Sequence, residues 1–189
     1  MATRRRARAH SSPLATLNVP PIVQLWLLRL MVPLGGHREF VGPHGFTNDP
    51  VAEVLGLGEW VEPFSGSFPP KDVRTKLRQL HAVAERKLSE SEVPVCLSGN
   101  VARLARLVGL SNADCRILEF GVLIRTEQLL AELSDSLGTL SLLKLIHVLA
   151  VLLNLPEHEV RVSLDGQGLL AKSGLLSLDR SSSAFSRVT

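Results

Sequence analysis

The chain has 189 residues, which is enough for one large domain or two small ones with a hydrophobic core. Apolar residues make up 45% of it and aromatic residues only 4%, so the core must consist mainly of Leu, Val, Ile and Ala, a composition that favours packed helices. The net charge is only +3, and four positive charges lie at Arg4, Arg5, Arg6 and Arg8. A duplex-binding domain usually carries a basic face, and overall composition does not indicate one here.

The cysteines and the apolar runs argue against two further kinds of site. Cys96 and Cys115 are too few and too far apart for a CxxC site, and we expect both to be reduced thiols in a cytoplasmic protein. The apolar runs 22–34 and 142–155 are too short to cross a bilayer, and a charged residue interrupts each of them. The sequence therefore predicts no membrane segment.

The first half of the chain predicts a tail and then a helical lobe. Residues 1–18 are Arg-rich and contain no acid, which indicates a disordered basic tail. The Gly-rich stretch 35–49 predicts a loop. Apolar periodicity, together with Pro and Gly at the ends of the periodic segments, predicts helices at 22–32, 51–57 and 71–90.

The second half predicts a second helical lobe after a boundary at 89–94. Ser111 and Asp114 have nearly the spacing and chemistry of a capping box, which indicates a helix start. In the helix before it, four apolar residues share one face: Val101, Leu104, Ala105 and Val108. Helices are predicted at 99–110, 114–124, 127–137 and 141–155.

The segment 141–179 is the most informative part of the chain. An apolar helix, a tight turn at Leu155-Pro156, a second short helix and a Gly-punctuated tail together resemble a helix-turn-helix with a small wing. The predicted fold is therefore mainly α, with two helix-turn-helix or winged-helix-like lobes at 19–90 and 91–180. At most a small β-hairpin is expected near 168–179, and residues 181–189 should be a frayed tail.

One short pattern occurs in both halves. Residues 69–77 and 156–164 both read P-x-x-[D/E]-V-R-x-x-L, and each copy follows a short apolar helix. Shared helix-start chemistry explains the pattern, with Pro at the entry and an acid in the first turn. Two related helix-turn-helix lobes would explain it as well.

The strongest catalytic signal is a stretch at 166–173 that differs by one residue from the phosphate-binding loop G-x-x-x-x-G-K-[ST]. Gly166, Lys172 and Ser173 match that loop, but Ala171 replaces its second Gly, where the backbone must approach phosphate closely. We interpret the match as coincidental and predict a turn with Lys172 in solvent. No catalytic residue, cofactor or metal is predicted.

Nucleic-acid binding is the alternative that the helix-turn-helix pattern raises. The second helix would enter the major groove, yet it begins with Glu157 and Glu159, whose charges oppose phosphate. Arg74, Lys76 and Arg78, together with the basic tail, would be the DNA contacts of a winged-helix regulator. An ordinary solvated face of an amphipathic helix explains the same three residues.

Three stretches carry a resemblance to a known family: NVPPIVQLWLLRLMVPLGGHREFV, GNVARLARLVGLSNADCRILEFGVLI and LLAKSGLLSLDR. They resemble the region that precedes the ATPase module in certain bacterial AAA+ family ATPases, and the resemblance covers roughly residues 18–180. It implies a helical, winged-helix-like N-terminal region that works with a P-loop motor. The chain departs from the family in having no Walker A, Walker B or arginine finger, so no catalytic residue is carried over.

The function that we expect is a non-enzymatic protein-interaction or regulatory module. The resemblance implies that it recruits a protein partner or substrate for an ATPase motor outside these 189 residues. Trp60, Phe64, Arg74 and Arg78 are the candidate contact residues. Packing between the two lobes is an equal explanation for the two aromatic side chains, since large apolar groups are usually buried.

Overall fold

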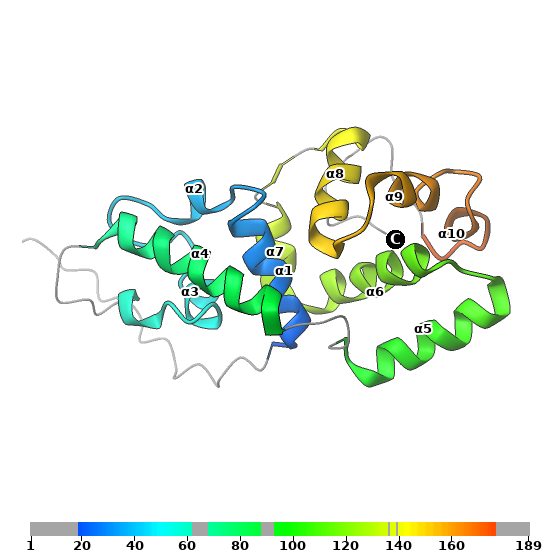
Figure 1. Ribbon diagram of the computed structural model, residues 1–189, viewed down its shortest axis with the longest axis horizontal. Helices are drawn as coiled ribbons and strands as arrows, with labels where there is room; N and C mark the ends of the chain where they lie inside the picture. Colours follow the sequence, from blue (N-terminus) through cyan, green and yellow to red (C-terminus); the bar gives the residue numbers. More distant parts are fainter. Residues whose placement is uncertain (1–18, 62–67, 88–92, 136, 139, 177–189) are drawn as a thin grey trace, which may run out of the picture.

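The computed structural model describes residues 19–61, 68–87, 93–135, 137–138 and 140–176. In these ranges the protein is mainly α-helical, which confirms the predicted fold class, and their only β-pairing is an isolated bridge between Val41 and Phe46. The helices in chain order are α1 (Pro21–Met31), α2 (His37–Phe40), α3 (Asp49–Val54), the 3-10 helix η1 (Gly58–Trp60), α4 (Pro70–Lys87), α5 (Val95–Val108), α6 (Asn112–Thr126), α7 (Gln128–Asp135), α8 (Leu142–Leu153), α9 (Glu157–Ser163) and α10 (Leu169–Lys172) (Figure 1).

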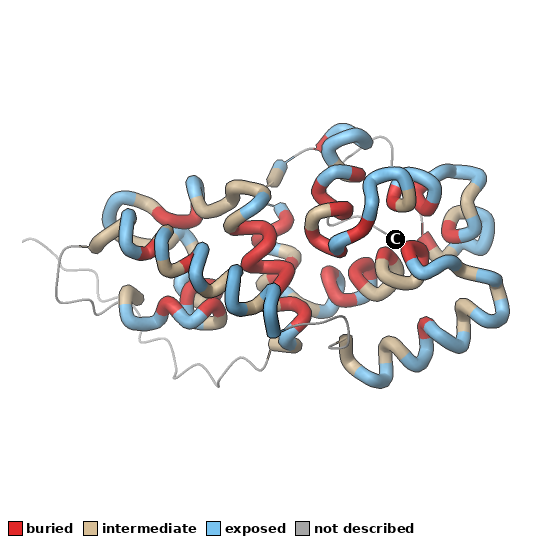
Figure 2. The backbone as a smooth tube through the Cα atoms, viewed as in Figure 1, coloured by how far each residue is buried: buried red, intermediate tan, exposed pale blue. Residues whose placement is uncertain are grey.

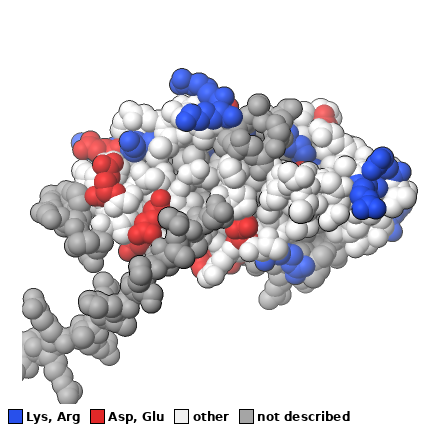
Figure 3. Space-filling view, turned by 90° about the horizontal axis from the view of Figure 1, so that it is seen from below, with Lys and Arg blue, Asp and Glu red and all other residues white. Residues whose placement is uncertain are grey.

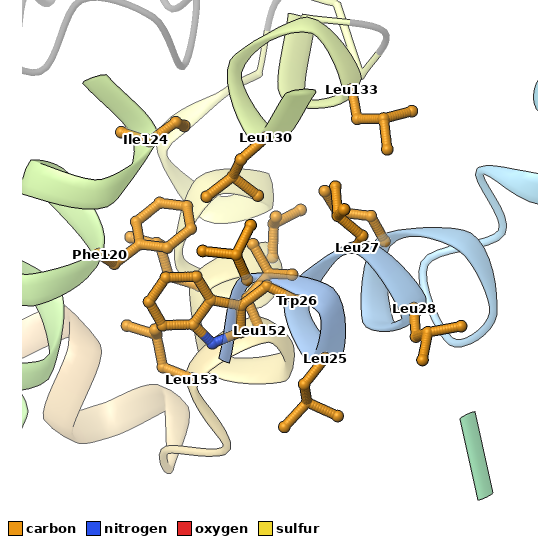
Figure 4. Packing of buried hydrophobic residues seen from close by; sticks show 14 of the residues in the cluster. Leu25, Trp26, Leu27, Leu28, Phe120, Ile124, Leu130, Leu133, Leu152 and Leu153 are labelled. Atoms are coloured by element: carbon orange, nitrogen blue, oxygen red, sulfur yellow. The ribbon is translucent and has the colours of Figure 1, made fainter. Parts of the chain in front are cut away.

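Helix α1 is the centre of the hydrophobic core. Nine of its eleven residues are buried, and it packs against α4 on one side and against α7 and α8 on the other. Trp26 meets Phe120 of α6 edge-on, with 5.1 Å between the ring centroids (Figure 4). A helix that is apolar all round is stable only where neighbours cover every face, and these helices provide that cover.

The second half is built on the helix-turn-helix that the sequence predicts. Asn154 ends α8 in the left-handed conformation at φ 51°, Leu155 is buried, and α9 begins directly after Pro156. Both helices pack against α6. The predicted start of α6 is confirmed, because Ser111 and Asp114 form a complete capping box.

Two details of the sequence interpretation were wrong. The predicted loop 35–49 contains the four-residue helix α2, and α5 begins at Val95, four residues earlier than expected. The sequence allowed at most a small β-hairpin near 168–179, and in the described part of that segment the chain forms α10 and a turn. Leu170 of α10 is fully buried, so this segment gains more from inserting an apolar side chain into the core than from extending as a wing.

The two halves of the chain share one hydrophobic core. The buried cluster includes residues from both halves, and α1 of the first contacts α7 and α8 of the second. The division into lobes at 19–90 and 91–180 therefore stays a prediction, and the two lobes do not have separate hydrophobic cores. The tails expected at 1–18 and 181–189 lie outside the described residues.

Candidate functional site

Helix α5 has the fewest buried residues of the long helices. Its main packing partner is α6, and Val101 is its only buried residue. Figure 2 shows the difference from α1: the α5 tube is almost entirely pale blue or tan, while α1 is mostly red. The side of the helix opposite Val101 faces solvent. We call it the outer α5 face, and it consists of Val95, Cys96, Gly99, Arg103, Arg106 and Leu107.

The outer α5 face carries the two most exposed large apolar side chains among the described residues. Val95 is 85% exposed and Leu107 is 84% exposed, compared with 69% for Val162, the next in rank. The predicted shared face of Val101, Leu104, Ala105 and Val108 is confirmed as the inner side, where all four are buried or half-buried. Val95 and Leu107 therefore contribute little to the core and stay in contact with water.

The charges on α5 are all positive. Arg103 and Arg106 are exposed, the helix contains no Asp or Glu, and neither guanidinium forms an ion pair or a hydrogen bond with the described part of the chain. On the face shown in Figure 3, Lys and Arg lie in separate groups and do not merge into a continuous basic surface. Such a distribution suits local contacts with carboxylates better than contacts along a phosphate backbone.

Elsewhere, Arg29 forms an ion pair within the first half and a hydrogen bond to the second half. Arg29 of α1 is 6% exposed, and its guanidinium donates to both carboxylate oxygens of Glu85 in α4, at 2.7 and 2.8 Å. Its Nη1 also donates to the carbonyl of Leu152 in α8. The hydrogen bond from Arg29 is the main reason that the pKa of Glu85 lies below its ordinary value, and partial burial only partly opposes it.

An open groove of about 440 Å³ lies beside this ion pair. His81 Nε2 lies 3.1 Å from the carboxylate of Glu85, and His147 Nδ1 lies 2.8 Å from that of Glu157. Among the described residues that line the groove there is no Ser, Thr, Cys or Lys, so its polar side chains are histidines, carboxylates, Arg29 and Asn154. Among the described residues, no three His, Cys, Asp or Glu side chains gather as a metal site.

Sequence reasoning missed this groove because its members are far apart in the chain. Arg29 and Glu85 are separated by 56 residues, and no local pattern relates them. The contact between His147 and Glu157 did have a local signal. A helix-turn-helix brings the last turns of its first helix close to the first turn of its second.

The structure separates the basic residues proposed as DNA contacts. Arg74 is half-buried and donates to the carbonyl of Val41 at 3.2 Å, while Lys76 is half-buried and Arg78 is exposed. Positions 74 and 78 share one side of α4, but position 76 lies two residues from each and points elsewhere. The three side chains therefore do not form one surface.

The remaining sequence-predicted residues lie in places with ordinary structural roles. Trp60 belongs to η1 and is half-buried against the core, and Phe64 lies outside the described residues. Lys172 is exposed at the end of α10, and the hydroxyl of Ser173 donates to the carbonyl of Leu169 at 2.6 Å.

The glycines of this stretch also have local roles. Gly166 is exposed in the turn after α9. Gly168 lies against that helix, since a Cβ there would come within 3.1 Å of the carbonyl oxygens of Asp165 and Val162. The absence of a side chain at 168 thus allows the close approach of two backbone segments.

None of the described helices is both long and apolar enough to cross a membrane. No protein-family model, no curated protein and no solved structure matches this chain.

Proposed function

We propose that this chain is a non-enzymatic protein-interaction module that recruits a partner or a substrate for an ATPase motor. The observation that carries the proposal is the outer α5 face. A helix normally stabilises a fold by burying an apolar stripe, but α5 buries one residue and exposes Val95 and Leu107. Exposed apolar side chains beside unpaired charges are typical of surfaces that a protein partner covers.

The resemblance to AAA+ N-terminal regions supports the recruiting role. In such an arrangement the interaction surface and the motor belong to different modules, so the chain needs a contact surface but no nucleotide site of its own. The residues proposed as contacts shift accordingly. Val95, Arg103, Arg106 and Leu107 replace Arg74, whose guanidinium contacts a backbone carbonyl inside the protein.

Site-specific photocrosslinking in the producing cell tests the interaction surface. A benzophenone amino acid at Leu107 should give a crosslinked species of discrete mass, which mass spectrometry then identifies. The matched control places it at Leu143 of α8, which is 66% exposed and lies outside the outer α5 face. No crosslink at 107, or the same product from both positions, would contradict the proposal.

Reading the coding sequence beyond the codon for Thr189 tests the link to a motor. We expect a G-x-x-x-x-G-K-[ST] motif and a Walker B acid, either in the same frame or in a neighbouring gene. A stop codon with no ATPase gene nearby would separate the interaction role from the AAA+ resemblance.

DNA binding is the second candidate because α4 is the most basic helix. It carries six basic residues, Lys71, Arg74, Lys76, Arg78, Arg86 and Lys87, against the acids Asp72 and Glu85. A DNA-binding regulator would bind duplex DNA at low salt, lose affinity steeply as salt rises, and weaken on Arg78→Glu. The absence of binding at low salt would exclude this candidate.

A further inference from the structure

We propose that the outer α5 face binds an amphipathic helix whose apolar stripe is flanked by carboxylates. This inference rests on the proposed interaction function and adds the chemical class of the partner. Four properties of the face carry it: its length, its shape, its charge and its poor fit to a second copy.

The length and shape of the face suit a helix. Val95 and Leu107 are twelve residues apart, or about 18 Å along the helix axis, which is about three and a third turns and puts the two side chains on opposite edges of the face. Gly99 lies between them, and nothing approaches within 4 Å of the place that a Cβ would occupy there. The face thus has an exposed apolar side chain near each end and a low point between them, into which a partner's large side chain can pack.

The charge of the face specifies acids on the partner. Arg103 and Arg106 lie beside Leu107 at the same end of the helix, and neither forms an ion pair with an acid in the described part of the chain. Arginine binds carboxylates through two parallel hydrogen bonds, and its stem adds apolar contact area. Covering this face without supplying acids would leave two desolvated cations unpaired.

A second copy of the chain satisfies the shape but not the charge. An antiparallel pair centred on residue 101 would bring Val95 of each copy level with Leu107 of the other along the helix axis. It would also bring four guanidinium groups into one contact to which α5 contributes no acid. Like charges at such short range oppose association, so the face favours a different, acidic chain.

A membrane surface suits the face less well than a protein helix. Helices that bind at the lipid interface present a broad apolar face with Trp, Phe or Leu side chains. The outer α5 face has one Leu, one Val and no aromatic residue, and Gly99 interrupts it at the centre. Its exposed apolar side chains are few, and the two arginines lie beside Leu107.

Binding of two synthetic peptides to the full chain tests the inference. The first is an 18-residue helix-forming peptide with Leu at every third or fourth position and Glu on both flanks, and the second has Gln in place of every Glu. Fluorescence anisotropy at low salt should give an affinity about tenfold higher for the Glu peptide, and this advantage should shrink as salt screens the charges. Equal affinities, or no binding of either peptide, would overturn the inference.

Variants of the chain then locate the binding. Arg103→Glu combined with Arg106→Glu should weaken the Glu peptide about tenfold or more, because two attractive pairs become repulsive. The control, Lys144→Glu with Arg161→Glu, changes the net charge equally on the exposed surface of α8 and α9 and should leave the affinity unchanged. Equal losses in both double variants would show that net charge, not this face, governs binding. Circular dichroism confirms that each variant is folded.

The remaining outcomes distinguish this inference from the proposed function. Specific crosslinking at Leu107 without preference for the Glu peptide would keep the interaction surface and reject the acidic partner. Failure of both experiments would reject both proposals. Concentration-dependent dimers abolished by Leu107→Ser would assign the face to a second copy, and tight binding to vesicles containing phosphatidylserine would assign it to a membrane; either result overturns the inference.

Discussion

Helices α4 and α5 are both long and amphipathic, and each packs mainly against one neighbour, yet they use their two sides differently. α4 places Val73 and Leu77 in the core and presents charged and polar side chains outward, with Val83 at 44% as its most exposed large apolar residue. α5 buries Val101 alone and leaves Val95 and Leu107 almost fully exposed. Folding accounts for the pattern of α4, while the two exposed apolar residues of α5 contribute little to the core.

The contrast extends to how each helix is held. α4 is tied to α1 by apolar packing and also by the ion pair between Glu85 and Arg29. α5 has no comparable polar tie among the described residues, although its two arginines are available for one. Helices that await a partner tend to be less stable locally, because some of the contacts that would hold them are supplied only on binding.

The same substitution at Leu77 and at Leu107 should give the largest difference. Leu77→Ala removes a side chain that is 1% exposed, and we expect a loss of about 3 kcal/mol in the free energy of unfolding. Leu107→Ala removes an exposed one and should change stability by less than about 0.5 kcal/mol. Urea denaturation measures both, and a large loss at 107 would mean that α5 is packed more tightly than described.

Removing Arg29 should have the next largest effect. Arg29→Ala leaves the half-buried Glu85 and the Leu152 carbonyl without their donor, and we expect a loss of about 2 kcal/mol, limited because water still reaches Glu85. Arg38→Ala in α2 is the control, since Arg38 is exposed and should tolerate the change. The double variant Arg29→Met, Glu85→Leu should recover part of the loss. If the double variant recovers nothing, the ion pair stabilises the fold by more than the neutralisation of the buried Arg29 charge.

The next effect in size is a difference in amide hydrogen exchange rate between α5 and its neighbour α6. We expect the central amides of α5 to exchange at least about tenfold faster than those of α6, because little apolar area is lost when α5 detaches. Adding the Glu peptide should slow exchange in α5 selectively. Equal protection in the two free helices would show that α5 is an integral part of the core.

The smallest expected effect is the pH dependence of the ion pair between Glu85 of α4 and Arg29 of α1. The pKa of Glu85 is lowered in the folded protein from its ordinary value of 4.5, chiefly by Arg29. A lowered acid pKa stabilises the fold above the unfolded value and loses that effect as the pH falls through the folded value. The protein should therefore be more stable than Glu85→Gln at pH 6, with the difference disappearing at a pH below the lowered pKa of Glu85. In an Arg29→Ala background most of this difference should be absent at both pH values.

Local patterns predicted much of the fold. The turn at Leu155-Pro156, the capping box at Ser111 and Asp114, and the inner side of α5 all follow from residues within one or two helical turns of one another. The repeated P-x-x-[D/E]-V-R-x-x-L pattern also has a local basis: Pro69 and Pro156 each precede a helix start, and Val73 and Val160 are both fully buried. Such signals act over short distances, so they survive in almost any tertiary context.

The candidate site was harder to predict because exposure is not a local property. Leu107 lies outside the predicted apolar face of its helix, but only the tertiary structure decides that no other described helix covers it. The same holds for Arg74. Its place in a basic helix indicates a free cation, but in the folded chain its guanidinium donates to the carbonyl of Val41.

The sequence by itself determined that the protein is helical, where most helices begin and end, and that a helix-turn-helix occupies residues 141–163, because propensity, periodicity and caps act within a few residues. Only the tertiary structure decided that Arg29 joins α1, α4 and α8, that residues 169–172 form a helix and not a wing, and that α5 keeps an apolar face in solvent. These features depend on which distant segments come together to cover a surface. The burial of one residue is therefore decided by many segments and not by its own stretch of sequence.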